Sequence, residues 1–166
     1  MRAARVLGTA LLAGLFVGFP GVAPADALFG GPPTATAAAS PAQEMLTLVN
    51  AARERAGCGA VRLDGRLTAA ATKHSADMAA NDYFSHTGRN GSSFASRIEA
   101  EGYPSPRAEN IAAGRTTART TFTQWMDSSG HRRNILDCSA KDMGLGVATD
   151  PGSTYRTYWT QEFGRG

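Results

Sequence analysis

Cysteine and histidine are scarce in this chain of 166 residues, which contains two cysteines and three histidines. The chain also has no Gly-x-Ser-x-Gly elbow, no His-Glu-x-x-His pair and no phosphate-binding glycine loop. These short motifs mark α/β-hydrolases, zinc proteases and P-loop nucleotide-binding proteins. Neither cysteine stands in a recognisable signature of a catalytic thiol. The sequence therefore excludes the commonest nucleophilic, metalloprotease and nucleotide-dependent chemistries.

Charge of one sign is not concentrated in the sequence. Lysine and arginine total 17 against 14 acidic residues, for a formal net charge of +3. The basic residues are scattered, and only Arg132 and Arg133 are adjacent. A nucleic-acid-binding protein concentrates positive charge on one face or in one groove. We therefore expect no nucleic-acid partner, although the charge would allow a loose association with anionic cell-wall polymers.

The first residues have the pattern of a secretory signal peptide. Arg2 and Arg5 precede an apolar run over residues 6–19, and small residues follow up to Ala27. The run is shorter than the roughly 20 residues that a membrane-spanning helix needs. We expect residues 1–27 to be removed and the mature protein to be secreted without a transmembrane segment. A retained membrane anchor is the alternative.

A linker and one domain are expected after the signal peptide. Residues 28–41 are rich in Gly, Pro, Ala and Thr and supply almost no side chains for a core, which is typical of a flexible or extended linker. Residues 42–166 have a length that suits one domain with a single hydrophobic core.

Cys58 and Cys138 are the only cysteines. An even number of cysteines in an exported chain favours a disulfide bond between them. Neither cysteine has the Cys-x-x-Cys spacing or the histidine partner of a zinc site. A pair of buried free thiols is the alternative.

Apolar residues at helical spacing predict two long helices. The first covers residues 45–56 and ends at Gly57, and the second covers 67–78 with Asp64 placed to cap its start. Shorter helices are expected from Ser92 or Ser93 to Ile98, and after Thr116 or Thr117 through Met126.

After Asp142 the apolar pattern changes to alternation, which predicts strands. In residues 143–148 the large apolar residues Met143, Leu145 and Val147 alternate with glycine or alanine. Residues 155–163 are rich in aromatic and β-branched side chains. Asp150-Pro151-Gly152-Ser153 between them has turn composition, so the two strands should form a hairpin. Residues 109–113 are a third candidate strand, which would complete a small antiparallel sheet.

Three separated segments carry two histidines and one glutamate. They are Asp82-Tyr83-Phe84-Ser85-His86, Glu109-Asn110-Ile111-Ala112-Ala113-Gly114, and Trp125-Met126 followed by Gly130-His131-Arg132. The spacing is too wide for a local metal motif, so only the fold can bring the three side chains together. With their flanks, from about residue 42 to residue 163, these segments resemble the bacterial form of the CAP superfamily, the cysteine-rich secretory, antigen 5 and pathogenesis-related 1 proteins.

The resemblance implies an α+β fold, an α-β-α sandwich in which a small antiparallel sheet lies between helical layers. It also implies a cleft that contains His86, Glu109 and His131. Two neutral imidazoles and a carboxylate with one open position can bind zinc and a water molecule. A divalent metal, zinc before others, is therefore the cofactor to expect, if the protein has one.

One position departs from the eukaryotic members of this family. They place a second acid three residues after the tryptophan of the helix before Gly-His, where this chain has Ser128. A hydroxyl carries no charge and is not a base near neutral pH, which weakens a mechanism with two carboxylates. Ser128 and Asn110 are expected to form supporting hydrogen bonds rather than to carry the chemistry.

Each of the cleft residues also has a purely structural interpretation. His86 would be a half-buried residue beside two aromatic rings, and Glu109 would accept backbone hydrogen bonds or pair with Arg132. His131 would cap the preceding helix, whose C-terminus favours positive charge. His74 lies on the apolar stripe of its helix and is expected to be a core residue.

Three functions from different classes remain open. The favoured one is a secreted, monomeric binding module without catalytic activity, whose cleft holds a divalent metal or a small envelope or lipid ligand. The second is a metal-assisted hydrolase of peptide or envelope polymer, which Ser128 disfavours. The third is a structural cell-surface protein without activity.

Overall fold

The computed structural model describes residues 38–166; the predicted signal peptide and residues 28–37 of the predicted linker lie outside the described residues. Pro41, the last residue of that linker, is already the first residue of a helix. The described residues form these elements: α1 (Pro41–Arg55), β1 (Arg62–Leu63), α2 (Gly65–Ala80), α3 (Phe94–Ala100), β2 (Pro106–Ala113), α4 (Ala118–Asp127), α5 (Ser129–Ile135), β3 (Asp142–Thr149) and β4 (Thr157–Gly164). Within this range no helix has the length and apolar character needed to cross a membrane.

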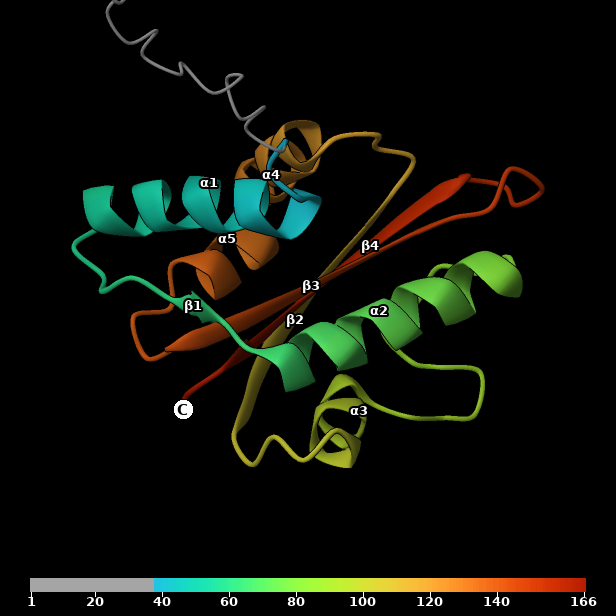
Figure 1. Cartoon of the computed structure of the whole chain (residues 1–166), viewed down its shortest axis with the longest axis horizontal. Coiled ribbons are helices and arrows are strands. Elements are labelled where there is room, and N and C mark those ends of the chain that lie inside the picture. The colour runs from blue at the N-terminus through green and yellow to red at the C-terminus, as the bar shows by residue number, and fades with distance from the viewer. Residues whose placement is uncertain (1–37) are drawn as a thin grey trace, which may run out of the picture. The chain divides into compact units, whose positions relative to one another are not determined.

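The four strands form one sheet in the order β1-β3-β4-β2 (Figure 1). The predicted hairpin of β3 and β4 is present, and β2 pairs antiparallel with the other side of β4. The third candidate strand is thus confirmed. The parallel pair of β1 with β3 was not predicted. Two exposed residues provide no apolar alternation from which such a strand could be recognised.

Helices cover both faces of the sheet, α2 and α3 one face and α1, α4 and α5 the other (Figure 1). On the first face, glycines allow α2 to approach the strands closely. A Cβ atom on Gly144 or Gly146 would lie 2.2 Å from backbone atoms of α2. This arrangement is the predicted α+β fold, an α-β-α sandwich.

The main hydrophobic core lies on the other face of the sheet. It contains Met45, Val49, Trp125, Ile135, Met143, Leu145, Trp159 and Phe163. Burial of these side chains is the main source of stability, at roughly 1.5–3 kcal/mol for each large side chain. Gln161 is buried on the same face of β4 as Trp159, two residues before it.

The predicted caps explain where the helices begin. Asp64, Ser93 and Thr117 each accept hydrogen bonds from backbone N–H groups of the first turn of their helices, a typical stabilising role for these residue types. After α1, Gly57 has a φ of 76°, in the left-handed region that glycine tolerates best. The short helix α5 includes Arg132 and Asn134.

The disulfide between Cys58 and Cys138 is present, as predicted. It joins the segment after α1 to the segment after α5. The buried side chain of Arg53 reinforces this junction by donating hydrogen bonds to the carbonyl oxygens of Gly59, Ile135, Asp137 and Ala140. The junction fixes α5, and with it His131, relative to α1.

Candidate functional site

Glu109 is the centre of a charged cluster to which α2, the loop after it, α3 and β2 contribute. Its side chain is 1% exposed and lies on β2, an edge strand of the sheet. Its Oε1 is 2.6 Å from Nδ1 of His86, and its Oε2 is 2.5 Å from Nη2 of Arg97. Nε2 of His74 lies 3.9 Å from the same Oε2. Glu109 does not pair with Arg132, one of the structural alternatives considered for it, because Arg97 is the partner and Arg132 donates to the carbonyl of Met126.

Glu109 is ionised at neutral pH although it is buried. Burial alone would raise the pKa of its carboxyl, but the hydrogen bonds from His86 and Glu162 and the positive charge of Arg97 outweigh burial and lower the pKa below its usual value. A carboxylate accepts hydrogen bonds only. His86 therefore donates from Nδ1, and in the neutral form of the ring Nε2 carries the lone pair.

A second buried carboxyl, that of Glu162, lies beside Glu109. The two residues are directly opposite in the β2–β4 pairing, so their side chains lie on the same face of the sheet. As an acceptor Glu162 finds no donor within residues 38–166, but in its protonated form it donates a hydrogen bond to the carboxylate of Glu109. Burial, first, and then the negative charge of Glu109 raise the pKa of Glu162 well above its usual value. Glu162 is therefore protonated at neutral pH.

His74 is buried, as expected, but it contacts polar groups rather than only apolar ones. Its Nε2 is 2.9 Å from the carbonyl oxygen of Ser85, so this nitrogen is the donor. Its Nδ1 has no partner in the described part of the chain. Burial and, next, the charge of Arg97 lower the pKa of His74. The ring is thus a neutral spacer that holds the loop after α2 against the cluster.

His86 faces a cavity with a volume of about 400 Å³. The His86 side chain is 56% exposed, in contrast to its partner Glu109. The residues that line this cavity, here called the His86 cleft, are His86, Phe94, Arg107, Ala108, Glu109 and Asn134. The cleft combines one aromatic ring with hydrogen-bonding and cationic groups, a composition suited to a small polar ligand.

His131 lies within α5 and close to His86. Burial lowers the pKa of His131, and the neighbouring His86 lowers it further. Its Nδ1 is buried without a hydrogen-bond partner among the residues described. His131 does not cap α4, since α5 begins at Ser129 and contains it. The charge of His86 thus acts on His131, although His131 does not line the His86 cleft, and a site shared by the two histidines stays a prediction.

Asn110 connects this site to the other face of the sheet. Its Nδ2 donates to Oε1 of Gln161 at 3.0 Å and to the carbonyl oxygen of His131 at 3.3 Å. Its Oδ1 accepts from Asn134, which also donates to the carbonyl oxygen of Glu109. Asn110 thus fixes α5 against β2. Ser128 lies between α4 and α5, and its side chain makes no capping hydrogen bond to α5.

The arrangement does not assemble a metal site with three protein ligands. No group of three His, Cys, Asp or Glu side chains within residues 38–166 has the spacing to hold a metal ion. Both oxygens of Glu109 are engaged, by His86 and Arg97, so Glu109 orients His86 as carboxylates orient metal-binding histidines. Zinc binding through the two imidazoles stays a prediction.

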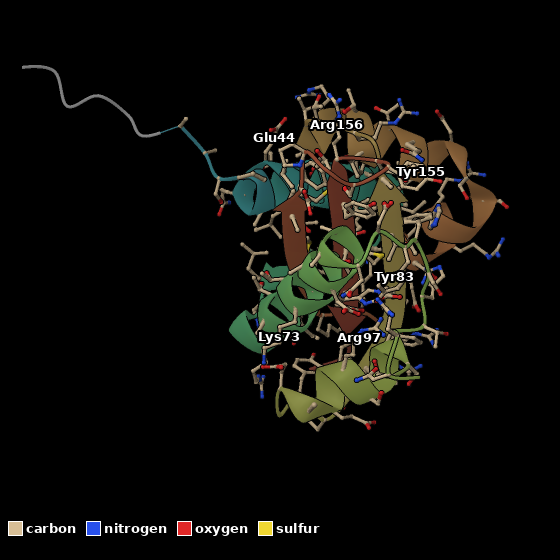
Figure 2. All side chains as sticks on the ribbon, turned by 90° about the vertical axis from the view of Figure 1, so that its right-hand side faces the viewer. Glu44, Lys73, Tyr83, Arg97, Tyr155 and Arg156 are labelled. Atoms are coloured by element: carbon tan, nitrogen blue, oxygen red, sulfur yellow. A yellow bond between two sulfur atoms is a disulfide. The ribbon has the colours of Figure 1, made fainter. Side chains whose placement is uncertain are left out.

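A larger cavity of about 470 Å³ lies between α2, α3 and the loop that joins them. Lys73, His74 and Arg97 are among its lining residues (Lys73 and Arg97 are labelled in Figure 2). Glu109 lines the His86 cleft and Arg97 lines this second cavity. Their ion pair therefore separates the two cavities.

Three members of the cluster were missed by sequence reasoning: His74, Arg97 and Glu162. The signal for Glu162 was a carboxylate in the otherwise buried β4, on the face shared by Tyr158 and Thr160. Arg97 lies in a seven-residue helix whose pattern gave no reason to distinguish it from a surface arginine. His74 was assigned to the core because its position matched the apolar stripe.

The comparisons with known proteins agree with this geometry. The model of the cysteine-rich secretory protein family (CAP) matches residues 46–163. The Bacillus subtilis (strain 168) protein YkwD is 33% identical over 122 residues, which are 73% of this chain and 46% of YkwD. The B. subtilis membrane protein YlbC is 32% identical over 123 residues, 73% of this chain and 33% of YlbC. The chain thus spans less than half the length of either relative.

Solved structures give the same answer. An extracellular protein from Bacillus anthracis str. Ames that contains an SCP domain is 30% identical, with a TM-score of 0.66 over 76% of this chain and 40% of that one. An outer surface protein from Borrelia burgdorferi shares the fold at 16% identity, with a TM-score of 0.65 over 74% of this chain and 90% of that one. The matched segment, the sandwich fold and the sequence identity lead to one conclusion: this chain belongs to the CAP, or cysteine-rich secretory protein, family.

Proposed function

We propose that this protein is an extracellular binding module that holds a small polar component of the cell envelope in the His86 cleft. The observation that carries the proposal is the state of Glu109, whose two oxygens are both engaged by His86 and Arg97. A carboxylate held in this way positions its neighbours and is not free to accept a proton from a substrate. The cleft is therefore built to bind.

The extracellular location is supported by two independent observations. The first is the predicted signal peptide at residues 1–27. The second is that the two solved structures reported above are described as an extracellular protein and an outer surface protein. YlbC is described as a membrane protein, so attachment to an envelope surface is also compatible with the family.

The lining of the cleft defines the kind of ligand. Nε2 of His86 accepts a hydrogen bond in the neutral ring and donates one in the protonated ring, Asn134 can both donate and accept, and Phe94 offers an apolar surface. Arg107 adds a cation at the rim, where it pairs with Asp137. These groups suit a small ligand with hydroxyl, amide or carboxylate groups, such as a fragment of a cell-wall polymer.

A hydrolase is the second candidate, because the Glu109–His86 pair leaves Nε2 of His86 as a potential general base. The site lacks the second ionised carboxylate that such a hydrolase would use. Ser128 occupies the position where eukaryotic family members have this acid, and Glu162 is protonated. One experiment separates the two functions, because a binding module leaves its ligand intact whereas a hydrolase releases cleavage products.

Calorimetry with soluble muropeptides tests the proposal, with phosphatidylglycerol vesicles as the probe for a lipid ligand. The His86→Ala variant should bind muropeptides at least tenfold more weakly, and Thr87→Ala, a neighbouring exposed residue outside the cleft, should bind like the wild type. Release of sugars or peptides from intact peptidoglycan would favour the hydrolase. Absence of binding to either probe would contradict the proposal.

A further inference from the structure

Two aromatic side chains are exposed beside each other at one end of the sheet. Phe84, in the loop after α2, is 44% exposed, and Tyr155, in the connection between β3 and β4, is 47% exposed. Their ring centroids are 5.9 Å apart and the ring planes are tilted by 58°. Figure 2, in which this end of the molecule faces the viewer, shows Tyr155 and Arg156 in that connection. We call Phe84 and Tyr155 the aromatic platform.

Asp82 holds together the two loops that carry the platform. It accepts hydrogen bonds from the backbone N–H of Thr154 at 2.7 Å and from the Thr154 hydroxyl at 2.9 Å. It also accepts one from the hydroxyl of Tyr158 at 3.1 Å. Tyr158 in turn packs edge-on against Tyr155, with ring centroids 6.0 Å apart. The two exposed rings are therefore fixed from below by a buried tyrosine and a carboxylate.

The backbone of both loops is strained. Asp82 has a φ of 47° and Arg156 a φ of 63°, and these are the only non-glycine residues with positive φ in residues 38–166. Such conformations cost energy for residues with a side chain, and they persist where the surrounding structure imposes them. The fold thus uses strained backbone on both sides to hold two aromatic rings at the surface.

The size of the platform excludes a large partner. Two half-exposed aromatic side chains offer roughly 200 Å², whereas a stable protein interface buries about 800 Å² on each partner. The third large apolar side chain exposed in the described residues, Leu63, lies on β1 at another edge of the sheet and does not extend this surface. A surface of this size fits a single small ring.

We propose that the aromatic platform stacks against a sugar ring of an extracellular glycan. The face of an aromatic ring carries negative potential, which attracts the positively polarised C–H groups on the face of a pyranose. The exposed Thr154 and Arg156 flank Tyr155 and offer hydrogen bonds to the sugar hydroxyls. Stacking on a nucleobase is less suited to this surface, because the positive charge of the chain is dispersed rather than gathered in a groove.

The platform is distinct from the His86 cleft. Neither Phe84 nor Tyr155 lines that cleft or the larger cavity, yet Phe84 precedes His86 by only two residues. A glycan on the platform would therefore lie next to the cleft, but its binding does not depend on the ligand proposed for the cleft.

Titration with N-acetylglucosamine tetrasaccharide, monitored by calorimetry, tests the platform with a glycan that has no peptide. Phe84→Ala and Tyr155→Ala should each weaken binding about tenfold, as expected for the loss of one stacking ring. Tyr155→Phe, which keeps the ring, should bind within about twofold of the wild type. Leu63→Ala is the matched control for removal of an exposed apolar side chain, and thermal unfolding verifies that each variant is folded.

The outcomes separate this inference from the proposed function. Loss of binding in the platform variants with binding retained in His86→Ala supports the platform. Loss in His86→Ala with binding retained in Phe84→Ala Tyr155→Ala places the glycan in the cleft and overturns the platform. Absence of tetrasaccharide binding by the wild type also overturns it, as does platform-dependent binding to phosphatidylglycerol vesicles in its place. The three outcomes that overturn the platform do not decide whether the His86 cleft binds muropeptides, which the separate muropeptide titration measures.

Discussion

Glu109 and Glu162 face each other across the β2–β4 pair, where the carboxylate of Glu109 accepts hydrogen bonds from His86, Arg97 and the protonated Glu162. His86 and Arg97 both donate hydrogen bonds to Glu109, which is ionised, while Glu162 keeps its proton. Two adjacent buried carboxylates would repel each other strongly, and retention of one proton avoids that repulsion. The pair therefore holds a single negative charge in the interior of the site.

Replacement of Glu162 by glutamine should stabilise the protein, and increasingly so as the pH rises. The folded state raises the pKa of Glu162, so the unfolded chain loses this proton first and wild-type stability falls with increasing pH. The glutamine side chain of the variant has no such proton to lose. The difference in free energy of unfolding should grow by at most about 1.4 kcal/mol per pH unit above the usual pKa of a glutamate. Urea denaturation at a series of pH values from mildly acidic to mildly alkaline measures it.

Glu109→Gln provides the matched control with the opposite sign. The pKa of Glu109 is lowered in the folded state, so its stabilising contribution is present above the usual pKa and is lost as the pH falls through the folded value. This variant should be less stable than the wild type at neutral pH. If Glu162→Gln were the less stable variant at mildly alkaline pH, the assignment of the proton to Glu162 would be wrong.

Arg97→Gln should destabilise the protein by about 3 kcal/mol, because removal of one member of a buried ion pair leaves the other charge uncompensated. The Arg97 side chain is 11% exposed and that of Glu109 is 1% exposed, so water cannot replace the guanidinium easily. Arg89→Gln is the control. Arg89 is exposed and donates to the side chain of Asn81, and its loss should change stability by less than about 0.5 kcal/mol. Equal denaturation midpoints for the two variants would contradict a buried, structural Arg97–Glu109 pair.

Most of the fold could be predicted because local physics and tertiary packing agree. The side chains at positions 64, 93 and 117 cap helices in isolation as they do in the fold. The alternation in β3 reflects its two covered faces, with large side chains toward the main core and glycines toward α2. The short helix α5 and the two-residue strand β1 were not predicted, since such short elements contain too few residues to display a period.

The site was harder to predict because its members are held by long-range contacts. His86, Glu109 and His131 were identified through the family resemblance, and the structure places His86 against Glu109. Arg97 and Glu162 were not identified. Their importance depends on which strand β2 pairs with and on the packing of α3 beside it, and neither feature is visible in the local sequence.

Loss of the disulfide should destabilise the protein strongly. Cys58 and Cys138 are separated by 80 positions, and closure of a loop of this length restricts the unfolded chain by an amount worth roughly 4 kcal/mol. A Cys58→Ser Cys138→Ser variant should show this loss in chemical denaturation. Reductant should lower the stability of the wild type and leave the variant unchanged. If alkylation without reductant labelled both thiols of the exported protein, the bond would be absent in the protein as produced.

Zinc binding, if the protein has it, should depend on the two imidazoles together. Because Nδ1 of His86 donates to Glu109, Nε2 carries the lone pair that a metal requires, and the lowered pKa of His131 keeps that ring neutral at neutral pH. The described residues supply no group of three ligands, so the affinity should be well below that of a closed structural zinc site.

Calorimetric titration with zinc at neutral pH should show binding by the wild type and a loss of at least tenfold in a His86→Ala His131→Ala variant. Binding should also weaken at acidic pH, since protonated imidazole cannot ligate a metal. His131 should remain competent below the usual histidine value of about 6.5, because both burial and His86 disfavour its protonation and so lower its pKa. Thr87→Ala is a suitable control: it alters an exposed residue of the same loop, outside the cleft, and should leave the zinc affinity unchanged. Equal zinc affinity in the wild type and the double variant would rule out a shared site between His86 and His131.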